Sequence, residues 1–414
     1  MFLSPNLRGL GFVYVSILMH AIGFGLIYPV LPDLLRDLTR LSDDKLALHM
    51  GGLTFIYASM QFFLMPVFGA LSDSFGRRPV LLISMLALAG DFLLLALAPS
   101  IVFVYLGRMI AGGLGATLST ANAYISDVTQ GNERAQRFAM VGAIYGVGFM
   151  IGPAIGGVLG DSGSIFGDMS GTRLPFFIAA ILSALSFCVG FFVLEESLNK
   201  EDRTGFSFKH SSLSTALRSL NLSAYQRSLL SALFVIAMAH TVYATLYALS
   251  AQVKFNWSSR EIGLGLFIIG LGSIIVQGVL IRIIIPRFGL QRTAMIGLMS
   301  GFIAYLMLGL SRTGLSFYAA GIFVAFASLA TAAMTNMISL SVDKGGQGKV
   351  HGAIGSLQGL ALMIGPLLMS FVFYFATKEG ARFNEPGAPF ILSSFFILTA
   401  LVAFLYGLAL KKRQ

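Results

Sequence analysis

The chain has 414 residues, of which 56% are hydrophobic and only 11% are charged, and its formal net charge is +10. Soluble domains carry roughly 25% charged residues, so this composition excludes a soluble domain and indicates a polytopic membrane protein. Lipid offers the backbone no hydrogen-bond partner and the apolar runs are about 20 residues long, so we expect the spanning segments to be helices.

Twelve apolar runs are long enough to span a bilayer as helices. They cover residues 9–31, 49–71, 79–98, 101–125, 137–160, 174–194, 228–252, 261–284, 292–311, 314–341, 350–376 and 389–410. The first run continues through Pro29 and Pro32 without a small-residue cleavage site, so we expect a spanning helix and not a cleaved signal peptide. The sequence therefore predicts an all-α membrane protein with twelve transmembrane helices.

The distribution of Lys and Arg predicts the orientation. An even number of spans places both termini on one side, and 18 of the 28 Lys and Arg residues fall in the loops and tails of that side, against nine on the other. Because cytoplasmic loops carry the excess of positive charge, we expect both termini in the cytoplasm and the chain in the cell's inner (plasma) membrane. The positive charge is thus a topology signal, and no nucleic-acid partner is expected.

The chain divides into two related halves. Residues 195–227 form a long hydrophilic segment, which predicts a cytoplasmic linker, with a surface helix at 211–220, between six-helix bundles at 1–194 and 228–414. The run Met150–Pro153 recurs as Met363–Pro366, at an offset of 213 residues. At the same offset, Gly76, Gly142 and Gly146 correspond to Gly289, Gly355 and Gly359. Several matches at one offset indicate an internal duplication, which is typical of transporters built from parallel repeats.

Three motifs carry a family resemblance. The turn between the second and third predicted helices holds Gly69, Leu71, Asp73, Gly76, Arg77 and Arg78. This spacing resembles G-x-L-x-D-x-x-G-R-[RK], the signature of the major facilitator superfamily. The fifth predicted helix carries Gly148, Gly152, Pro153, Gly156 and Gly157, which resembles G-x-x-x-G-P-x-x-G-G, the signature of that superfamily's antiporters. Arg108, followed by Gly112 and Gly113, is similar to the superfamily's fourth-helix arginine motif.

Two further stretches narrow the resemblance. Residues 23–32 and 121–137 are similar to those of the tetracycline–proton antiporters, in the drug:proton antiporter branch. The resemblance implies the major facilitator fold, with two pseudo-symmetric six-helix bundles. It also implies a proton-coupled antiporter that exports a small amphipathic organic compound or drug by alternating access. The expected partners are a small-molecule substrate, protons and the lipid bilayer, and the expected chain is a monomer without a cofactor.

The resemblance also assigns a gating role to the charged turn. Asp73 is implied to face the N-terminal end of the eleventh helix, where the helix dipole favours an anion, and Arg77 is implied to reach Asp127. These contacts would latch the cytoplasmic side shut. The alternative is that Asp73, Arg77 and Arg78 are a solvated topology signal. The glycines from Gly148 to Gly157 are implied to seal the contact with the opposite half, the alternative being a simple packing ridge.

Two charged residues lie deep in the predicted helices. Asp91 and Arg108 fall at similar depths, about 10 Å below the outer face at roughly 1.5 Å per residue, so we expect them to pair. Buried charges in membrane helices are by default functional, which predicts that Asp91 lines the substrate path or exchanges a proton and that Arg108 tunes it. A purely structural ion pair is the alternative. His20 and His240 are either cavity residues that exchange protons or hydrogen-bonded core residues.

Other polar or aromatic side chains within the helices are candidates for the pathway: Gln61, Asn122, Tyr145, Tyr243, Gln277, Asn336 and Gln358. Helix packing is the alternative for each. The chain also departs from the tetracycline antiporters, which have acids at the positions of His20 and Tyr305 and a histidine at that of Ser273. Because a cationic chelate needs those carboxylates, the sequence disfavours metal-chelated tetracycline as the substrate.

Alternatives on the same fold are export of one dedicated metabolite or siderophore, and proton symport. A membrane enzyme would need a nucleophile, an acid–base pair or a metal group near a membrane face, and the loops offer no convincing one. The sequence contains no nucleotide loop of the G-x-x-x-x-G-K-[ST] type and no cluster at metal-ligand spacing, so no ATP, metal or other cofactor is expected. A channel is disfavoured by the duplication and the antiporter motif.

Overall fold

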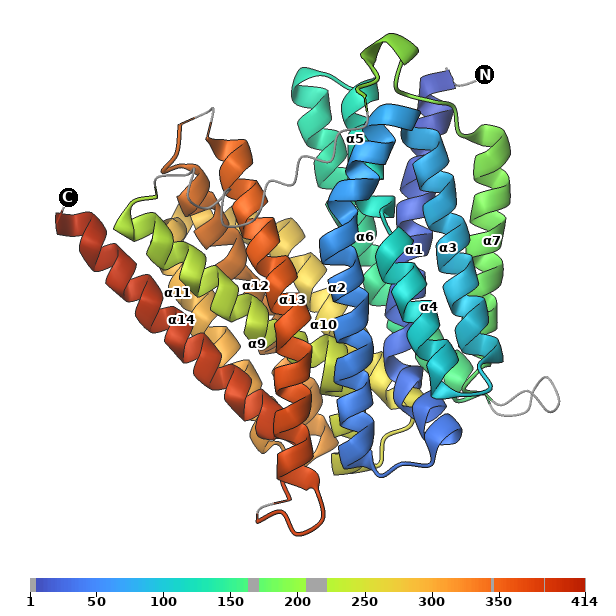
Figure 1. Ribbon diagram of the computed structural model, residues 1–414. Coiled ribbons are helices and arrows are strands. Elements are labelled where there is room, and N and C mark those ends of the chain that lie inside the picture. Colours follow the sequence, from blue (N-terminus) through green and yellow to red (C-terminus); the bar gives the residue numbers. More distant parts are fainter. Residues whose placement is uncertain (1–4, 163–170, 206–221, 344–345, 383, 414) are drawn as a thin grey trace. The chain divides into compact units, whose positions relative to one another are not determined.

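The structure is a computed structural model that describes residues 5–162, 171–205, 222–343, 346–382 and 384–413 (Figure 1). Its helices are α1 (Pro5–Thr39), α2 (Asp43–Phe75), α3 (Arg77–Leu97), α4 (Ile101–Leu114), α5 (Thr117–Val128), α6 (Gly131–Gly160), α7 (Leu174–Val193), η1 (Lys200–Asp202), α9 (Ala224–Phe255), α10 (Ser259–Ile275), η2 (Val276–Leu280), α11 (Ile281–Leu310), α12 (Gly314–Ser339), α13 (Gln347–Thr377) and α14 (Ala388–Arg413). No strand occurs among the described residues, as an all-α protein requires. The predicted surface helix at 211–220 lies outside them.

Eleven described helical stretches are long and apolar enough to cross a membrane. One of them, Ser259–Leu310, has 52 residues. At about 1.5 Å per residue this stretch is more than twice as long as the hydrocarbon core of a bilayer is thick. Gly289 interrupts it with φ 76° and ψ 164°, far from helical values, and thereby divides it into two spans. Counted in this way, the prediction of twelve spans agrees with the structure.

The first helix is longer than predicted. It runs from Pro5 to Thr39 instead of ending at residue 31, and both Pro29 and Pro32 lie inside it. Proline is tolerated within membrane helices because neighbouring helices satisfy the carbonyl groups that it frees. The two prolines therefore do not mark the end of the span.

The fourth predicted helix, 101–125, is wrong as a continuous element. α4 ends at Leu114 and α5 begins at Thr117, so one span consists of two helices. Gly112, Gly113 and Gly115 lie next to the break, and glycine is a poor helix former because its backbone loses the most entropy on ordering. The break separates Arg108 on α4 from Asn122 on α5.

The described helices form two compact units. Unit 1 comprises Met1–Leu41, Ile56–His210 and Ser258–Phe267, and unit 2 comprises Ser42–Phe55, Ser211–Trp257 and Ile268–Gln414. In unit 1, α1 packs along α6, and α3 packs against α4 and α7. In unit 2, α11 packs on α12, and α9 on α13 and α14. Figure 1 shows the start of α1 at the same end of unit 1 as the turn between α2 and α3.

Candidate functional site

Unit 1 holds a buried ion pair between α3 and α4. Asp91 is 0% exposed and Arg108 is 6% exposed. The Arg108 Nε donates a hydrogen bond of 3.2 Å to Asp91 Oδ1, and its Nη2 donates to Oδ2. A Cβ atom at Gly107 would lie 2.6 Å from Asp91 Oδ1, so only glycine leaves room for this carboxylate. The structure thus joins the two charges that the sequence placed at one depth.

Aromatic rings from three helices lie beside this pair. The ring of Tyr57 on α2 faces the Arg108 guanidinium, with 5.9 Å between Cζ and the ring centroid. Tyr57 contacts Phe24 on α1, and Phe24 contacts Tyr28 on α1 and Phe149 on α6, which also contact each other. The ring centroids in these four contacts lie 5.4–6.4 Å apart. We call Phe24, Tyr28, Tyr57 and Phe149 the aromatic cluster. Together, the aromatic cluster and Arg108 combine apolar ring surface with a cation, which is the chemistry that an amphipathic ligand requires.

Sequence reasoning missed most of the aromatic cluster. Phe24 and Tyr28 are four residues apart and therefore share one face of α1, and this spacing was the available signal. Gln61, a predicted pathway residue, joins the cluster because its Nε2 lies 3.5 Å from Tyr57 Oη. Phe149 lies inside the antiporter motif, which was interpreted only through its glycines and its proline.

The other three predicted pathway residues of unit 1 lie on α1, α5 and α6. His20 and Asn122 are both half-buried. The Nδ1 atom of His20 is buried and has no hydrogen-bond partner among the described residues. Tyr145 packs against the apolar core that includes Val13 and Ile17. His20 therefore has an unsatisfied polar atom among the described residues, whereas Tyr145 contributes to the apolar core.

In unit 2 the second histidine is tied to a tyrosine. His240 Nδ1 on α9 and Tyr305 Oη on α11 are 2.9 Å apart, and Tyr305 is 1% exposed. Tyr243, one turn further along α9, has its ring centroid 5.3 Å from that of Tyr305 and 6.1 Å from that of Tyr247, with the ring planes tilted. This geometry favours the hydrogen-bonded alternative for His240. Tyr305 was noticed in the sequence only as a departure from the tetracycline antiporters.

The remaining three predicted pathway residues of unit 2 lie on different helices. Gln277 is exposed within η2, a single π-helical turn between α10 and α11. Such turns occur frequently at functional sites because they re-aim side chains without ending the helix. Asn336 on α12 is exposed, and Gln358 on α13 is half-buried. That these residues share one path with those of unit 1 stays a prediction.

The charged turn of unit 1 is held by several polar contacts. Arg77 forms an ion pair with Asp73, and its Nε donates to Asp127 Oδ2 at 3.0 Å. Its Nη1 also donates to Ser72 Oγ at 3.1 Å, while Arg78 donates to the carbonyl of Phe191 at 2.6 Å. The implied contact of Arg77 with Asp127 is thus present. These arginines are bonded within the protein and are more than a solvated topology signal.

Glu196 completes this turn, and sequence reasoning missed it. Its carboxylate accepts hydrogen bonds from the backbone N–H of Arg77 at 2.8 Å and of Arg78 at 3.2 Å, at the N-terminus of α3. Gly76, with φ 111°, lies so close that a Cβ atom there would overlap the Glu196 carboxylate. An anion at a helix N-terminus satisfies otherwise unpaired N–H groups. The start of the predicted linker is therefore bound to unit 1.

The glycines of the antiporter motif pack α6 closely against two helices of unit 1. A Cβ atom at Gly148 would lie 2.7 Å from that of Ala21, and Gly152 and Gly156 similarly meet the α1 backbone. Gly157 instead faces α10, where a Cβ atom would lie 3.1 Å from the Cα of Gly263. The predicted contact with the sequence's second half therefore applies to Gly157, while the other glycines pack α6 on α1.

Comparisons with known proteins agree with these features. A family model described as Major Facilitator Superfamily matches residues 13–366 and 229–413. The class C tetracycline resistance protein of Escherichia coli is 33% identical over 86% of this chain and 88% of its own length, and multidrug resistance protein 2 of Bacillus subtilis (strain 168) is 27% identical over 86% and 87%. A crystal structure of the nucleoside transporter NupG, in a mutant form, covers 98% of this chain and 100% of its own with a TM-score of 0.77 at 13% identity. The predicted fold and resemblance are confirmed: the chain belongs to the Major Facilitator Superfamily.

Proposed function

We propose that this protein is a proton-coupled antiporter that exports a small amphipathic organic compound or drug by alternating access. The observation that carries the proposal is the buried Asp91–Arg108 pair beside the aromatic cluster. A proton-coupled antiporter needs a group that can exchange a proton and a nearby surface that can bind the substrate. Relatives named for tetracycline and multidrug resistance support export as the direction of transport.

In the proposed mechanism, a proton and the Arg108 guanidinium compete for the Asp91 carboxylate. In its charged form Asp91 holds the Arg108 guanidinium by its Nε and Nη2 atoms, while Cζ lies over the Tyr57 ring. A proton on Asp91 removes the charge that holds Arg108, and the side chain is then free to reorient on the cluster. Proton binding at Asp91 and substrate binding at the rings are thereby coupled, since both depend on where the guanidinium lies.

The proposed substrate is an amphipathic compound rather than a metal-chelated tetracycline. Acids would attract a cationic chelate, and the resemblance places them at residues 20 and 305, where this chain has His20 and Tyr305. Residue 305 is a buried tyrosine that bonds to His240, so this position supplies a hydroxyl instead of a carboxylate. Ring surface, by contrast, is present in both units.

We further propose a monomer in the lipid bilayer of the inner membrane, with both termini in the cytoplasm. The halves are 1–194 and 228–414, the linker is 195–227, and Asp73 engages the N-terminal end of α13 when the cytoplasmic side is shut. The bias of Lys and Arg toward the loops of the terminal side supports this orientation.

The decisive test uses purified protein in proteoliposomes, with the compound from a small-molecule panel that raises the melting temperature most. We expect this compound to drive proton movement that stops in Asp91→Asn, because an amide cannot exchange the proton. Asp202→Asn is the matched control, since Asp202 is an exposed acid of η1. Transport without any response to a pH gradient would refute proton exchange, and unchanged transport in Asp91→Asn would remove Asp91 from the mechanism.

A further inference from the structure

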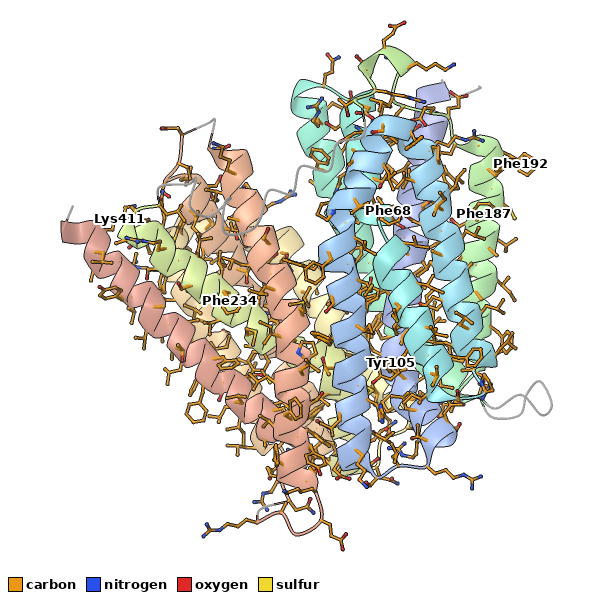
Figure 2. The ribbon with its side chains drawn as sticks, viewed as in Figure 1. Phe68, Tyr105, Phe187, Phe192, Phe234 and Lys411 are labelled. Atoms are coloured by element: carbon orange, nitrogen blue, oxygen red, sulfur yellow. The ribbon has the colours of Figure 1, made fainter. Side chains whose placement is uncertain are left out.

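A cavity of about 410 Å³ lies in unit 2, and none of the predicted pathway residues is part of its lining. Its walls come from the start of α9, the break in α11 and the ends of α12 and α14: Tyr225, Phe288, Gly289, Leu290, Gln291, Arg292, Met337, Leu340, Ser341 and Lys411. α9 begins here, α11 breaks at Gly289, and α12 and α14 end here, so the cavity lies where spanning helices start, break or stop. Figure 2 shows Lys411 beside the start of α9.

The cavity is cationic. Its lining includes Arg292 and Lys411 but no acidic residue. Arg292 is exposed and has no ion-pair or hydrogen-bond partner among the described residues. The Lys411 ammonium lies 5.2 Å from the centroid of the Tyr225 ring and has no acidic partner in the described part of the chain. Two cations that converge on one cavity without a counter-charge favour an anionic ligand.

Tyr225 supplies an independent signal. Its side chain is 4% exposed and lines the cavity, yet its hydroxyl has no hydrogen-bond partner among the described residues. A buried polar group without a partner destabilises a fold by about 1–3 kcal/mol, so such groups are rare and call for a specific reason. A ligand that accepts a hydrogen bond from this hydroxyl is such a reason.

The internal duplication supplies a comparison for this turn. Gly289 has φ 76° and ψ 164°, and Gly76, its counterpart 213 residues earlier, has φ 111° and ψ 164°. After Gly76, the first two N–H groups of α3 donate to the Glu196 carboxylate. After Gly289 the helix restarts with Leu290 and Gln291, whose N–H groups have no partner within the new helix.

The two turns differ in what lies in front of them. A Cβ atom at Gly76 would overlap Glu196, whereas a Cβ atom at Gly289 would meet nothing within 4 Å. Unit 1 therefore supplies its own carboxylate, and unit 2 has open, cationic space at the same place in the repeat.

We infer that this cavity binds an anionic group of phosphate or carboxylate type. The backbone N–H groups of Leu290 and Gln291, the side chains of Arg292 and Lys411 and the hydroxyl of Tyr225 are its donors. The group takes the place that Glu196 has in unit 1. Two sources present this chemistry at a membrane face, the headgroup of an anionic phospholipid and a free phosphate ion.

The test measures thermal unfolding of the full-length protein in detergent at increasing concentrations of three probes. These are inorganic phosphate, short-chain phosphatidylglycerol and short-chain phosphatidylcholine, the last a zwitterionic control. A ligand of the folded state raises the melting temperature by mass action, which yields an apparent Kd. We expect stabilisation by phosphatidylglycerol beyond that by phosphatidylcholine if the source is a lipid, and by phosphate as well if the site accepts the free ion.

Variants separate this site from general surface charge. The double substitution Arg292→Gln/Lys411→Gln should raise the apparent Kd of the stabilising anion by about tenfold or more. The matched control is Arg282→Gln/Arg287→Gln, which removes the same charge from α11 outside the lining and should leave the Kd unchanged. Equal weakening in both double variants would overturn the inference, and so would the absence of stabilisation by either anion.

Tyr225→Phe tests the hydroxyl alone. Because this hydroxyl has no protein partner, its removal should not lower the melting temperature without anion, but it should weaken anion binding by about tenfold. An unchanged Kd in Tyr225→Phe would show that the hydroxyl is not a donor to the ligand.

Discussion

A single missing methyl group at Gly107 makes room for the buried carboxylate of Asp91, and the neighbouring Arg108 neutralises it. Two charges removed from water are expensive unless each satisfies the other, and breaking such a pair is more harmful than replacing both partners. The stability of the pair and its role in transport are therefore separate properties. They can be measured separately.

We predict that Arg108→Gln destabilises the protein by about 3–5 kcal/mol, because it leaves Asp91 buried and unpaired. The double variant Asp91→Asn/Arg108→Gln should recover most of this loss, since two amides can bond to each other, but it should not recover substrate-driven proton movement. Melting temperature and proteoliposome transport are the two measurements. Recovery of transport together with stability would mean that the ion pair is only structural.

The two histidines differ in a way that only their surroundings decide. His240 bonds to the hydroxyl of Tyr305, whereas the buried Nδ1 of His20 has no partner among the described residues. From the sequence alone both are single histidines in apolar helices. Hydrogen-bond partners on other helices cannot be predicted from local composition. The sequence therefore could not show that His240 has a partner among the described residues and His20 has none.

At the scale of elements, two helices restart after a glycine in a conformation that other residues avoid. Gly76 precedes α3 and Gly289 interrupts α11, and both have positive φ with ψ 164°. A side chain in this region of φ/ψ space costs about 1–3 kcal/mol. At Gly76 the helix N-terminus also binds the Glu196 carboxylate, so the same backbone device carries an additional interaction in unit 1.

The duplicated turns provide a matched pair of substitutions. We predict that Gly289→Ala destabilises the fold only through the strain of a side chain at positive φ, whereas Gly76→Ala also displaces Glu196. Gly76→Ala should therefore lose about 1.5–3 kcal/mol more of the free energy of unfolding, from charge-assisted hydrogen bonds. The melting temperature should therefore fall further in Gly76→Ala. An equal fall in the two variants would contradict the role assigned to Glu196.

At the scale of the whole molecule, charge determines the proposed orientation. The loops and tails on the side of the termini carry 18 of the 28 Lys and Arg residues. Within unit 1, the start of α1, the charged turn and η1 lie at one end of the helices (Figure 1). The start of α1 and the basic turn thus lie at the same end of unit 1, as the positive-inside rule requires if this end is cytoplasmic.

Cysteine labelling in intact cells tests this orientation. The single Cys188 is exposed on α7, so Cys188→Ala provides a cysteine-free background. In that background, Glu379→Cys in the loop after α13 should react with a membrane-impermeant maleimide, and Lys200→Cys in η1 should react only after the membrane is opened. Both positions are exposed, so a difference in labelling reports sidedness. The reverse pattern would place the termini outside.

The spans, the repeat and the family could be predicted from the sequence, because each depends on local composition or on residue spacing along the chain. A run of apolar residues enters lipid whatever its neighbours are, and the motif at Gly69–Arg78 is contiguous. Residue spacing also predicted that Asp91 and Arg108 lie at one depth, since helix rise is constant. The break between α4 and α5 and the π turn at Gln277 were not predicted, because local helix geometry there also depends on packing.

Which side chains contact one another could not be predicted from the sequence and is seen in the three-dimensional structure. Glu196 lies 119 residues from Arg77 along the chain and yet accepts its backbone N–H, and the aromatic cluster joins rings from α1, α2 and α6. The cationic cavity likewise combines residues of four helices of unit 2 that are distant in sequence. Such contacts depend on how helices rotate and cross, which is set by packing between segments distant in sequence. For that reason the sequence predicted that the turn at Gly76 matters, and the structure showed which anion it binds.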